Sequence, residues 1–112
     1  MTSLKNSVQL IGRLGNEPEI KEFESGKKLA KFSIATNDRY YNNKGEQVEE
    51  TQWHNIVAWG KKADLAESYL HKGAHIALEG KLINRSYDVD GAKRHVTEIA
   101  LNQMYMLEKR ES

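Results

Sequence analysis

Alternation of apolar and polar residues runs through most of this 112-residue sequence, and one short stretch departs from it. The alternation covers residues 4–14, 19–24, 28–36, 51–59, 74–87 and 93–107. A period of two is typical of half-buried strands. In residues 62–70 the apolar side chains instead share one helical face, and Lys72-Gly73 closes this single predicted helix. A doubly wound parallel sheet is excluded, because crossover helices are missing.

Turn signals separate these stretches. Gly15-Asn16-Glu17-Pro18 ends the first strand, and Ser25-Gly26 joins the next two as a hairpin. Asp88-Val89-Asp90-Gly91 predicts a second hairpin turn, and the strand that follows is expected to carry a bulge near Asn102. Residues 37–50 hold many charges and Asn42-Asn43-Lys44-Gly45, so we expect a long exposed loop or a flexible hairpin there.

The fold class expected from this pattern is all-β. Five antiparallel strands with one short helix between the third and fourth fit a small closed barrel of the OB-fold type, which binds oligonucleotides on a sheet face. The length leaves room for one domain, expected over residues 1–107, and residues 108–112 are expected to be a short disordered end. Because a fold does not by itself give a function, the site residues must carry that argument.

Two tryptophans lie on the strand predicted at residues 51–59. Trp53 and Trp59 are six residues apart, and an even spacing sends both indoles to the same side of a strand. The opposite side carries His54, Ile56 and Ala58 and is the more apolar one, so we expect it to face the interior. The rings are then displayed outward about 20 Å apart, a distance that suits different units of one extended ligand.

Composition excludes several other functions. The absence of cysteine excludes disulfides, thiolate zinc sites and cysteine nucleophiles. The histidines show no zinc-site spacing, and no phosphate-binding glycine loop or nucleophile with a base occurs, so we expect no metal, no cofactor and no enzyme activity. No stretch approaches a membrane span and no signal peptide is visible, which predicts a cytoplasmic protein.

Net charge is only +1, so a site for a polyanion must come from segregation of charge. Basic residues dominate the second half of the chain, where Lys81 and Arg85 share a strand face with Tyr87. Arg13, on the exposed side of the first strand, is a weaker candidate. Phe23, Phe32, Tyr69 and Tyr105 are assigned to ordinary packing.

Several segments together resemble the bacterial single-stranded DNA-binding proteins. They are VQLIGRLGNEPE at residues 8–19, AKFSIAT at 30–36, TQWHNIVAWGK at 51–61, YLHKG at 69–73 and LEG at 78–80. The match runs from about residue 4 to 107 in order and spacing. The resemblance implies an OB fold, a homotetramer associated with the nucleoid, and sequence-independent coating and protection of single-stranded DNA in replication, recombination and repair.

The resemblance also implies roles for individual residues. The stacking aromatics of the family fall on Tyr40, Trp53, Trp59 and Tyr87, and its basic positions fall on Lys61 and Lys72. Tyr40 and Tyr87 replace the usual tryptophan and are expected to stack less strongly, and Tyr41 is an adjacent substitute for Tyr40. His54 corresponds to a residue at the contact between subunits.

Physical chemistry also indicates that exposed aromatic rings bind unpaired strands, because every base offers a π face. Stacking on an aromatic ring is worth roughly 1–3 kcal/mol per base and tolerates any sequence. A duplex hides these faces. Lysines and arginines beside the rings attract phosphates and make binding depend on salt.

Alternatives remain open. An OB-type primosomal replication protein would be a dimer, and a protein–protein interaction module would use the exposed rings without DNA. Members of the family usually continue into a Gly- and Pro-rich tail with an acidic tip that recruits replication and repair proteins, whereas this sequence ends at Ser112 without one. It is either truncated or a short paralogue, and whether replication and repair proteins are recruited by that route stays an open alternative.

Overall fold

The structure is a computed structural model that describes residues 5–107 as six strands and one helix. The elements are β1 Val8–Leu14, β2 Glu19–Glu22, β3 Lys28–Tyr41, β4 Gln47–Trp59, α1 Lys61–Tyr69, β5 His75–Val89 and β6 Ala92–Met106. Residues 108–112, predicted to be disordered, lie outside the described residues.

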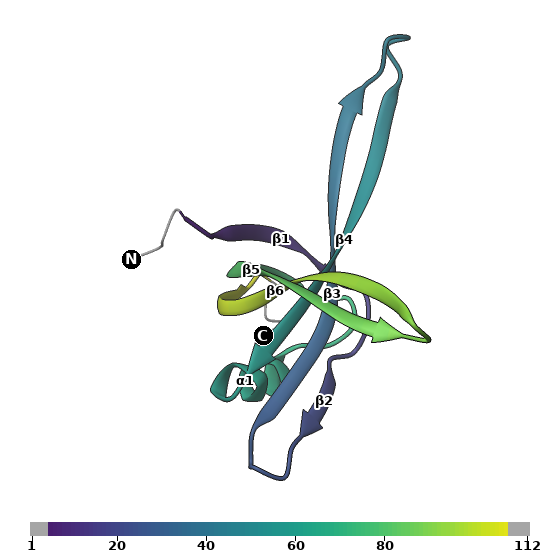
Figure 1. Cartoon of the computed structure of the whole chain (residues 1–112). Coiled ribbons are helices and arrows are strands. Elements are labelled where there is room, and N and C mark those ends of the chain that lie inside the picture. Colours follow the sequence, from purple (N-terminus) through teal and green to yellow (C-terminus); the bar gives the residue numbers. More distant parts are fainter. Residues whose placement is uncertain (1–4, 108–112) are drawn as a thin grey trace, which may run out of the picture.

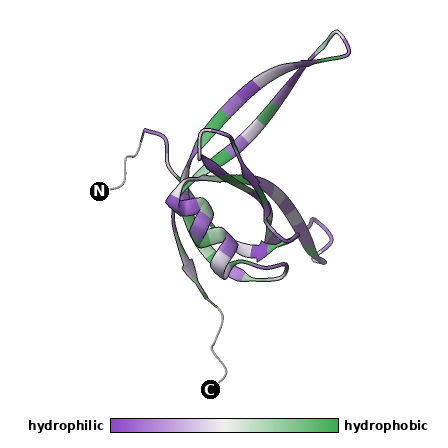
Figure 2. Ribbon diagram, turned by 90° about the horizontal axis from the view of Figure 1, so that it is seen from below, coloured by the Kyte–Doolittle hydropathy of each residue, from purple (hydrophilic) through white to green (hydrophobic). Residues whose placement is uncertain are grey.

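Five of the strands close into a barrel (Figures 1 and 2). The sheet order is β1-β5-β6-β4-β3, and β1 pairs again with β3 through Arg13 opposite Ala35 and Leu14 opposite Ile34. The short β2 pairs with the first residues of β3, outside this ring. Because α1 lies between the third and fourth barrel strands, the predicted OB-type fold class is confirmed.

The core fills the barrel with the inward residues of each strand. Ile34, Ile56 and Ile76 are each at most 1% exposed, and α1 contributes Ala63 and Ala66. The three isoleucines lie at positions that the alternation predicts to face inward. The helix covers one end of the ring and packs against β3, β4 and β6 (Figure 2).

Ion pairs fix α1 to the start of β3. The ammonium group of Lys28 contacts the carboxylates of Glu67 and, at 3.0 Å, Asp64. The hydrogen bond to Glu67, followed by that to Asp64, raises the pKa of Lys28 above its ordinary value. A raised lysine pKa stabilises the fold while the group is charged, so this contribution is present at neutral pH and is lost only in strongly alkaline solution.

The segment 37–50 forms a regular hairpin, and the alternative of a long irregular loop is wrong. Pairing of β3 with β4 continues without a break from Leu29 opposite Trp59 to Tyr41 opposite Gln47. The side chain of Asn42 accepts hydrogen bonds from the backbone N–H groups of Lys44 and Glu46 at 2.9 and 3.0 Å, which shapes the turn. The two strands stand away from the barrel as an arm (Figure 1).

A second hairpin, β5–β6, projects from another side of the barrel (Figure 1). Asp90 and Gly91 both have positive φ, 50° and 78°, as a two-residue hairpin turn requires. The bulge predicted near Asn102 is confirmed, because the register passes from Glu79 opposite Gln103 to Gly80 opposite Leu101. At Gly80 a Cβ would lie 2.3 Å from the carbonyl oxygen of Ala100, so only glycine permits this close crossing.

Three of the four aromatics assigned to packing are exposed instead. Phe32 is 4% exposed and belongs to the core, as expected, whereas Phe23, Tyr69 and Tyr105 are 38%, 56% and 64% exposed. Residues 5–107 contain no helix long and apolar enough to cross a membrane. The same residues contain no group of three or more histidine or acidic side chains placed to hold a metal ion.

Candidate nucleic-acid interface

Four strands contribute side chains to one continuous outer face of the barrel. Residues that pair directly across strands point to the same side of a sheet. By this register the outer face contains Lys31, Ser33 and Ala35 on β3, Trp53, Asn55, Val57 and Trp59 on β4, Val96, Glu98 and Ala100 on β6, and Lys81, Arg85 and Tyr87 on β5. The prediction that both indoles face outward is confirmed, with Trp53 61% and Trp59 39% exposed.

Val57 departs from the expectation that this side of β4 is exposed. It lies on the same side of β4 as the tryptophans, yet it is only 1% exposed and stands outside the core cluster. Lys31 flanks it on β3 and Ala100 on β6, so it occupies the middle of the sheet rather than an edge. Val57 therefore forms an apolar floor between the two exposed rings.

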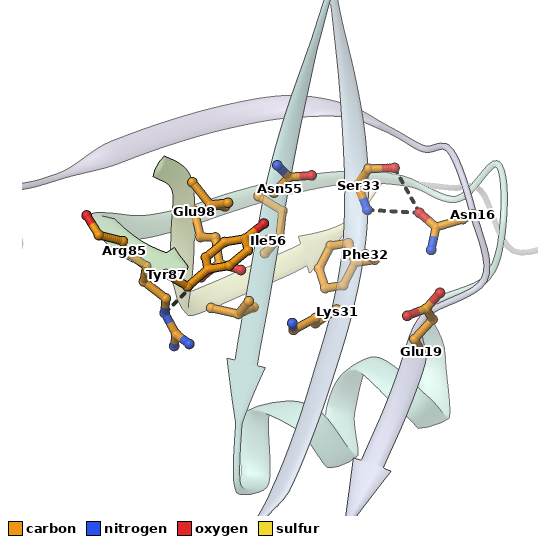
Figure 3. A pocket seen from close by; sticks show the side chains of 13 residues that line it. Asn16, Glu19, Lys31, Phe32, Ser33, Asn55, Ile56, Arg85, Tyr87 and Glu98 are labelled. Atoms are coloured by element: carbon orange, nitrogen blue, oxygen red, sulfur yellow. Dashed lines mark hydrogen bonds and ion pairs between the residues drawn. The ribbon is translucent and has the colours of Figure 1, made fainter. Parts of the chain in front are cut away.

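A hollow of about 710 Å³ opens over this floor (Figure 3). We call it the Tyr87 hollow, and its lining includes Asn16, Glu19, Lys31, Ser33, Asn55, Val57, Arg85, Tyr87, Val96 and Glu98. Asn55 and Val57 lie between Trp53 and Trp59 along β4, so the hollow lies between the two indoles. The β5–β6 hairpin thus brings Tyr87, which is 50% exposed, toward the strand that carries the tryptophans.

Trp53 rests on a glycine. A Cβ at Gly15 would lie 2.3 Å from Cζ3 of the indole, so the ring lies directly against this backbone. The supporting loop is tied to β3 because Asn16 Oδ1 accepts hydrogen bonds from the N–H and Oγ of Ser33, at 2.9 and 2.8 Å (Figure 3). One side of Trp53 is therefore supported by the protein, while the side chain as a whole stays largely exposed.

Trp59 stacks with Phe23. Their ring centroids are 6.1 Å apart with an angle of 21° between the planes, and Lys21 Nζ lies 5.4 Å from the Phe23 centroid. The sequence reasoning missed Phe23, although it shares the strand parity of the exposed Glu19 and Lys21. Its ring extends the aromatic surface beyond β4.

A second hollow, of about 470 Å³, adjoins Trp59. We call it the Trp59 hollow; Lys62, Lys81 and Asn102 line it with the indole. Lys62 Nζ lies 3.4 Å from Asn102 Oδ1, which directs this lysine toward β6. Lys62 was also missed, because the direction of α1 relative to the barrel is a tertiary property.

The other predicted cations lie in different surroundings. Arg85 pairs with Glu98, with Nε 3.0 Å from Oε1 (Figure 3). Arg13 lies across Ala35 from Trp53, and its Nη1 donates a 3.0 Å hydrogen bond to the carbonyl oxygen of Gly73. The neighbouring Lys72 donates its backbone N–H to Glu17 Oε1 at 3.1 Å. Both therefore lie near the Trp53 end of the outer face.

Lys61 lies apart from the Trp59 hollow. It is the first residue of α1 and lines a separate hollow that also contains the carboxylates of Glu22 and Asp64. Lys27 and Lys28 line this hollow as well, and the ammonium group of Lys28 is paired with Asp64 at 3.0 Å. Of the two lysines that begin the helix, Lys62 is the one beside an exposed indole.

Tyr40 and Tyr41 lie near the tip of the β3–β4 arm and are 48% and 73% exposed. The register places Tyr41 on the side of the ladder that carries Trp53, and Tyr40 on the other side. The right-handed twist of a two-stranded ribbon rotates both sides along its length. The arm consequently offers one ring on each side. His54, partly exposed at its base, hydrogen-bonds through Nε2 to Thr36 Oγ1 at 3.0 Å.

Comparisons with known proteins agree with this geometry. The model of the single-strand binding protein family matches residues 5–107. The sequence is 44% identical over 109 residues to single-stranded DNA-binding protein 1 of Chlorobaculum tepidum, covering 96% of this chain and 67% of that one. It is 47% identical over 105 residues to the single-stranded DNA-binding protein of Bacteroides thetaiotaomicron, covering 91% of this chain and 65% of that one.

Two solved structures share the fold. A Plasmodium falciparum SSB in complex with ssDNA matches with a TM-score of 0.86 and 35% identity, covering 96% of this chain and 98% of that chain. A deletion mutant of the single-stranded DNA binding protein from Thermus aquaticus matches with a TM-score of 0.82 and 28% identity, covering 94% of this chain and 51% of that one. The chain thus spans only about two thirds of the length of these bacterial relatives, or less.

Proposed function

The chain belongs to the single-strand binding protein family, and on that basis we propose that it binds single-stranded DNA without regard to sequence. In the cell this binding would coat and protect unpaired strands during replication, recombination and repair in the cytoplasm. The observation that carries the proposal is the outward pair Trp53 and Trp59 on either side of the Tyr87 hollow. Exposed rings at intervals along a face suit successive bases of one strand.

The strand path follows from the positions of rings and cations. Bases stack on Trp53, Trp59 and Tyr87, and the arm extends the path through Tyr40 or, on the side of the ladder that carries Trp53, through Tyr41. Phe23 supports Trp59 from one side. Phosphates contact Lys81 and Lys62 beside Trp59, Arg13 and Lys72 near Trp53, and, more weakly, Lys61 and Arg85, whose charges lie near carboxylates. Each phosphate neutralised releases counterions, so binding weakens as salt rises.

A fluorescence titration tests the proposal. Addition of oligo(dT) is expected to quench the emission of the two tryptophans, because stacked bases contact the indoles, and the quenching should weaken at high salt. Trp53→Ala is expected to lower affinity about tenfold or more. Absence of quenching at an excess of oligomer, with the protein folded, would reject single-strand binding.

Assembly as a homotetramer is part of the proposal. The outer surface of β1, β5 and β6 carries a patch that we call the Ile11 patch. It consists of the apolar residues Ile11, Ala77 and Tyr105 with Gln9, Gln103 and the largely buried Glu79, around a hollow of about 530 Å³. Ile11 and Tyr105 are 62% and 64% exposed, and large exposed apolar side chains gathered together favour a protein contact. His54 contributes a further contact between subunits. Sedimentation equilibrium separates four subunits from the two of a primosomal-type dimer.

A further inference from the structure

One side of the β3–β4 arm continues the outer face of the barrel. Along β3, Ser33 and Ala35 belong to that face, and Tyr41 has the same strand parity. Tyr40 has the parity of Ile34, which is buried in the barrel core. Pairing of β3 with β4 is unbroken as far as the tip, so the two sides are not exchanged along the arm. We call them the Tyr41 side and the Tyr40 side.

Exposed rings recur at one interval along the Tyr41 side. Trp59 and Trp53 are six residues apart on β4. Six residues beyond Trp53, Gln47 pairs directly with Tyr41. Each interval is about 20 Å at the rise of a strand residue. The twist of the ribbon rotates both sides together, so a ligand that follows one side from Trp59 past Trp53 reaches Tyr41.

The Tyr40 side of the arm carries negative charge. Asp38 and Glu50 pair directly across the strands there, and among the described strand residues of the arm this side holds no lysine or arginine. Two carboxylates placed opposite each other repel, and both repel a phosphate. On the other side Arg39 lies opposite Glu49, so the formal charges cancel. A polyanion is therefore disfavoured on the Tyr40 side.

We propose that Tyr41, rather than Tyr40, is the ring of the arm that stacks on single-stranded DNA. The assignment rests on the single-strand binding proposed above and deepens it, because it gives the arm contact to one residue on one side. The resemblance to the family gives that role to Tyr40. In this chain its neighbour continues the row of Trp59 and Trp53, and it is the more exposed ring, at 73% against 48%.

Photo-crosslinking tests the assignment on the unchanged protein. An oligomer that reaches the arm carries 5-iododeoxyuridine in place of thymidine, and irradiation joins this base to an aromatic ring stacked on it. Trypsin releases both tyrosines in one peptide, residues 40–44, and fragmentation of the peptide locates the modified ring. Cross-linking mainly at Tyr41 is expected. Equal or greater cross-linking at Tyr40, or none at either tyrosine while Trp53 reacts, would overturn the assignment. Failure of the oligomer to bind would instead reject single-strand binding itself.

Matched substitutions test the same assignment by affinity. Tyr41→Ala is expected to weaken binding of long oligo(dT) about fivefold or more, the lower end of stacking on one base, and Tyr40→Ala by less than about twofold. Tyr41→Phe keeps the ring and should keep the affinity. Equal losses for the two alanine variants, or a loss for Tyr41→Phe as large as that for Tyr41→Ala, would contradict stacking on this ring. Both tyrosines lie outside the core cluster, and thermal unfolding checks the fold of each variant.

A second matched pair adds a charge instead of removing a ring. Gln47→Lys places a cation opposite Tyr41, and Val48→Lys places one opposite Tyr40. Gln47→Lys is expected to tighten binding and to raise the slope of log affinity against log salt by about 0.7, the value for one phosphate on a single strand. Val48→Lys should leave the slope near its original value. An equal or larger change for Val48→Lys would show that the strand does not keep to the Tyr41 side.

Discussion

At the residue scale, the function proposed for Trp53 depends on a neighbour that has no side chain. The indole lies against the backbone at Gly15, where even a methyl group would overlap the ring at 2.3 Å. The loop cannot easily retreat, because Asn16 and Gly15 both hydrogen-bond to Ser33 on β3. Support of this kind fixes a ring before the ligand arrives and reduces the entropy lost on binding.

Gly15→Ala is therefore expected to displace Trp53 and lower the affinity for oligo(dT) by up to about tenfold, a fraction of the stacking energy of one base. The measurement is fluorescence titration, with thermal unfolding to confirm the fold. The control is a double-mutant cycle with Trp53→Ala. If Gly15 acts through the ring, adding Gly15→Ala to Trp53→Ala changes affinity no further; additive losses would contradict that role.

Lys61 and Lys62 form a matched pair at the start of α1, because Lys62 lines the hollow beside Trp59 and Lys61 lines a separate hollow that does not include an exposed indole. Lys62→Ala is expected to weaken binding and to reduce the slope of log affinity against log salt by about 0.7, the value for one phosphate on a single strand. Lys61→Ala should have the smaller effect. Titrations at several salt concentrations measure both, and equal slopes for the two variants would contradict the assignment.

At the element scale, the β3–β4 arm is a separable feature of the fold. Beyond the barrel its strands pair with each other, and its turn is shaped by its own Asn42. Its tyrosines lie on opposite sides of the ladder. The arm can therefore contact a long ligand without contributing to the core.

Replacing residues 38–50 by a two-residue Asn-Gly turn, which keeps Asn37 opposite Thr51, should leave the barrel folded, with an unfolding temperature changed by only a few degrees, since core residues such as Ile34 and Ile56 are retained. Affinity for long oligo(dT) should fall, while that for a short oligomer that reaches only the barrel is expected to stay near its original value. Within the intact arm, Tyr40→Ala and Tyr41→Ala show which side binds DNA. Equal losses for short and long oligomers would argue against a separate arm contact.

At the scale of the whole molecule, two exposed surfaces of opposite character lie on different parts of the barrel. The outer face across β3, β4, β6 and β5 carries rings and cations, whereas the exposed side chains of the Ile11 patch are apolar and are flanked by glutamines and by the largely buried Glu79. Ile11 and Tyr105 are both exposed to water, and gathered exposed apolar side chains of this size usually mark an interaction surface. The proposed tetramer would bury this patch and leave the ring-bearing face open.

Ile11→Glu combined with Tyr105→Ser is expected to reduce the mass measured by sedimentation equilibrium, because a buried charge without a partner opposes association. Leu65→Ser is the control, since Leu65 is likewise a large exposed apolar residue, at 46%, but lies on α1, away from the patch. The control variant should keep the original mass. An unchanged mass for the double variant would show that the subunit contact does not involve the Ile11 patch.

The sequence by itself determined the elements of this protein. Alternation located the barrel strands and the parity of Trp53 and Trp59, and turn chemistry located the Asp90-Gly91 hairpin; the bulge expected near Asn102 is also present. These features depend on contacts between near neighbours, which the order of residues records directly. The overlooked signal at Phe23 was of the same kind, because its parity matched exposed residues.

Only the tertiary structure decided how distant segments meet. No local pattern shows that Val57 is covered, that Lys62 rather than Lys61 lies beside Trp59, or that Glu98 and Tyr87 share a hollow with Asn55. Each of these depends on the closure of β1 onto β3 and on the β5–β6 hairpin leaning toward β4. Closing a barrel brings together residues that are far apart along the chain, and the free energy that selects one such arrangement comes from packing the whole core.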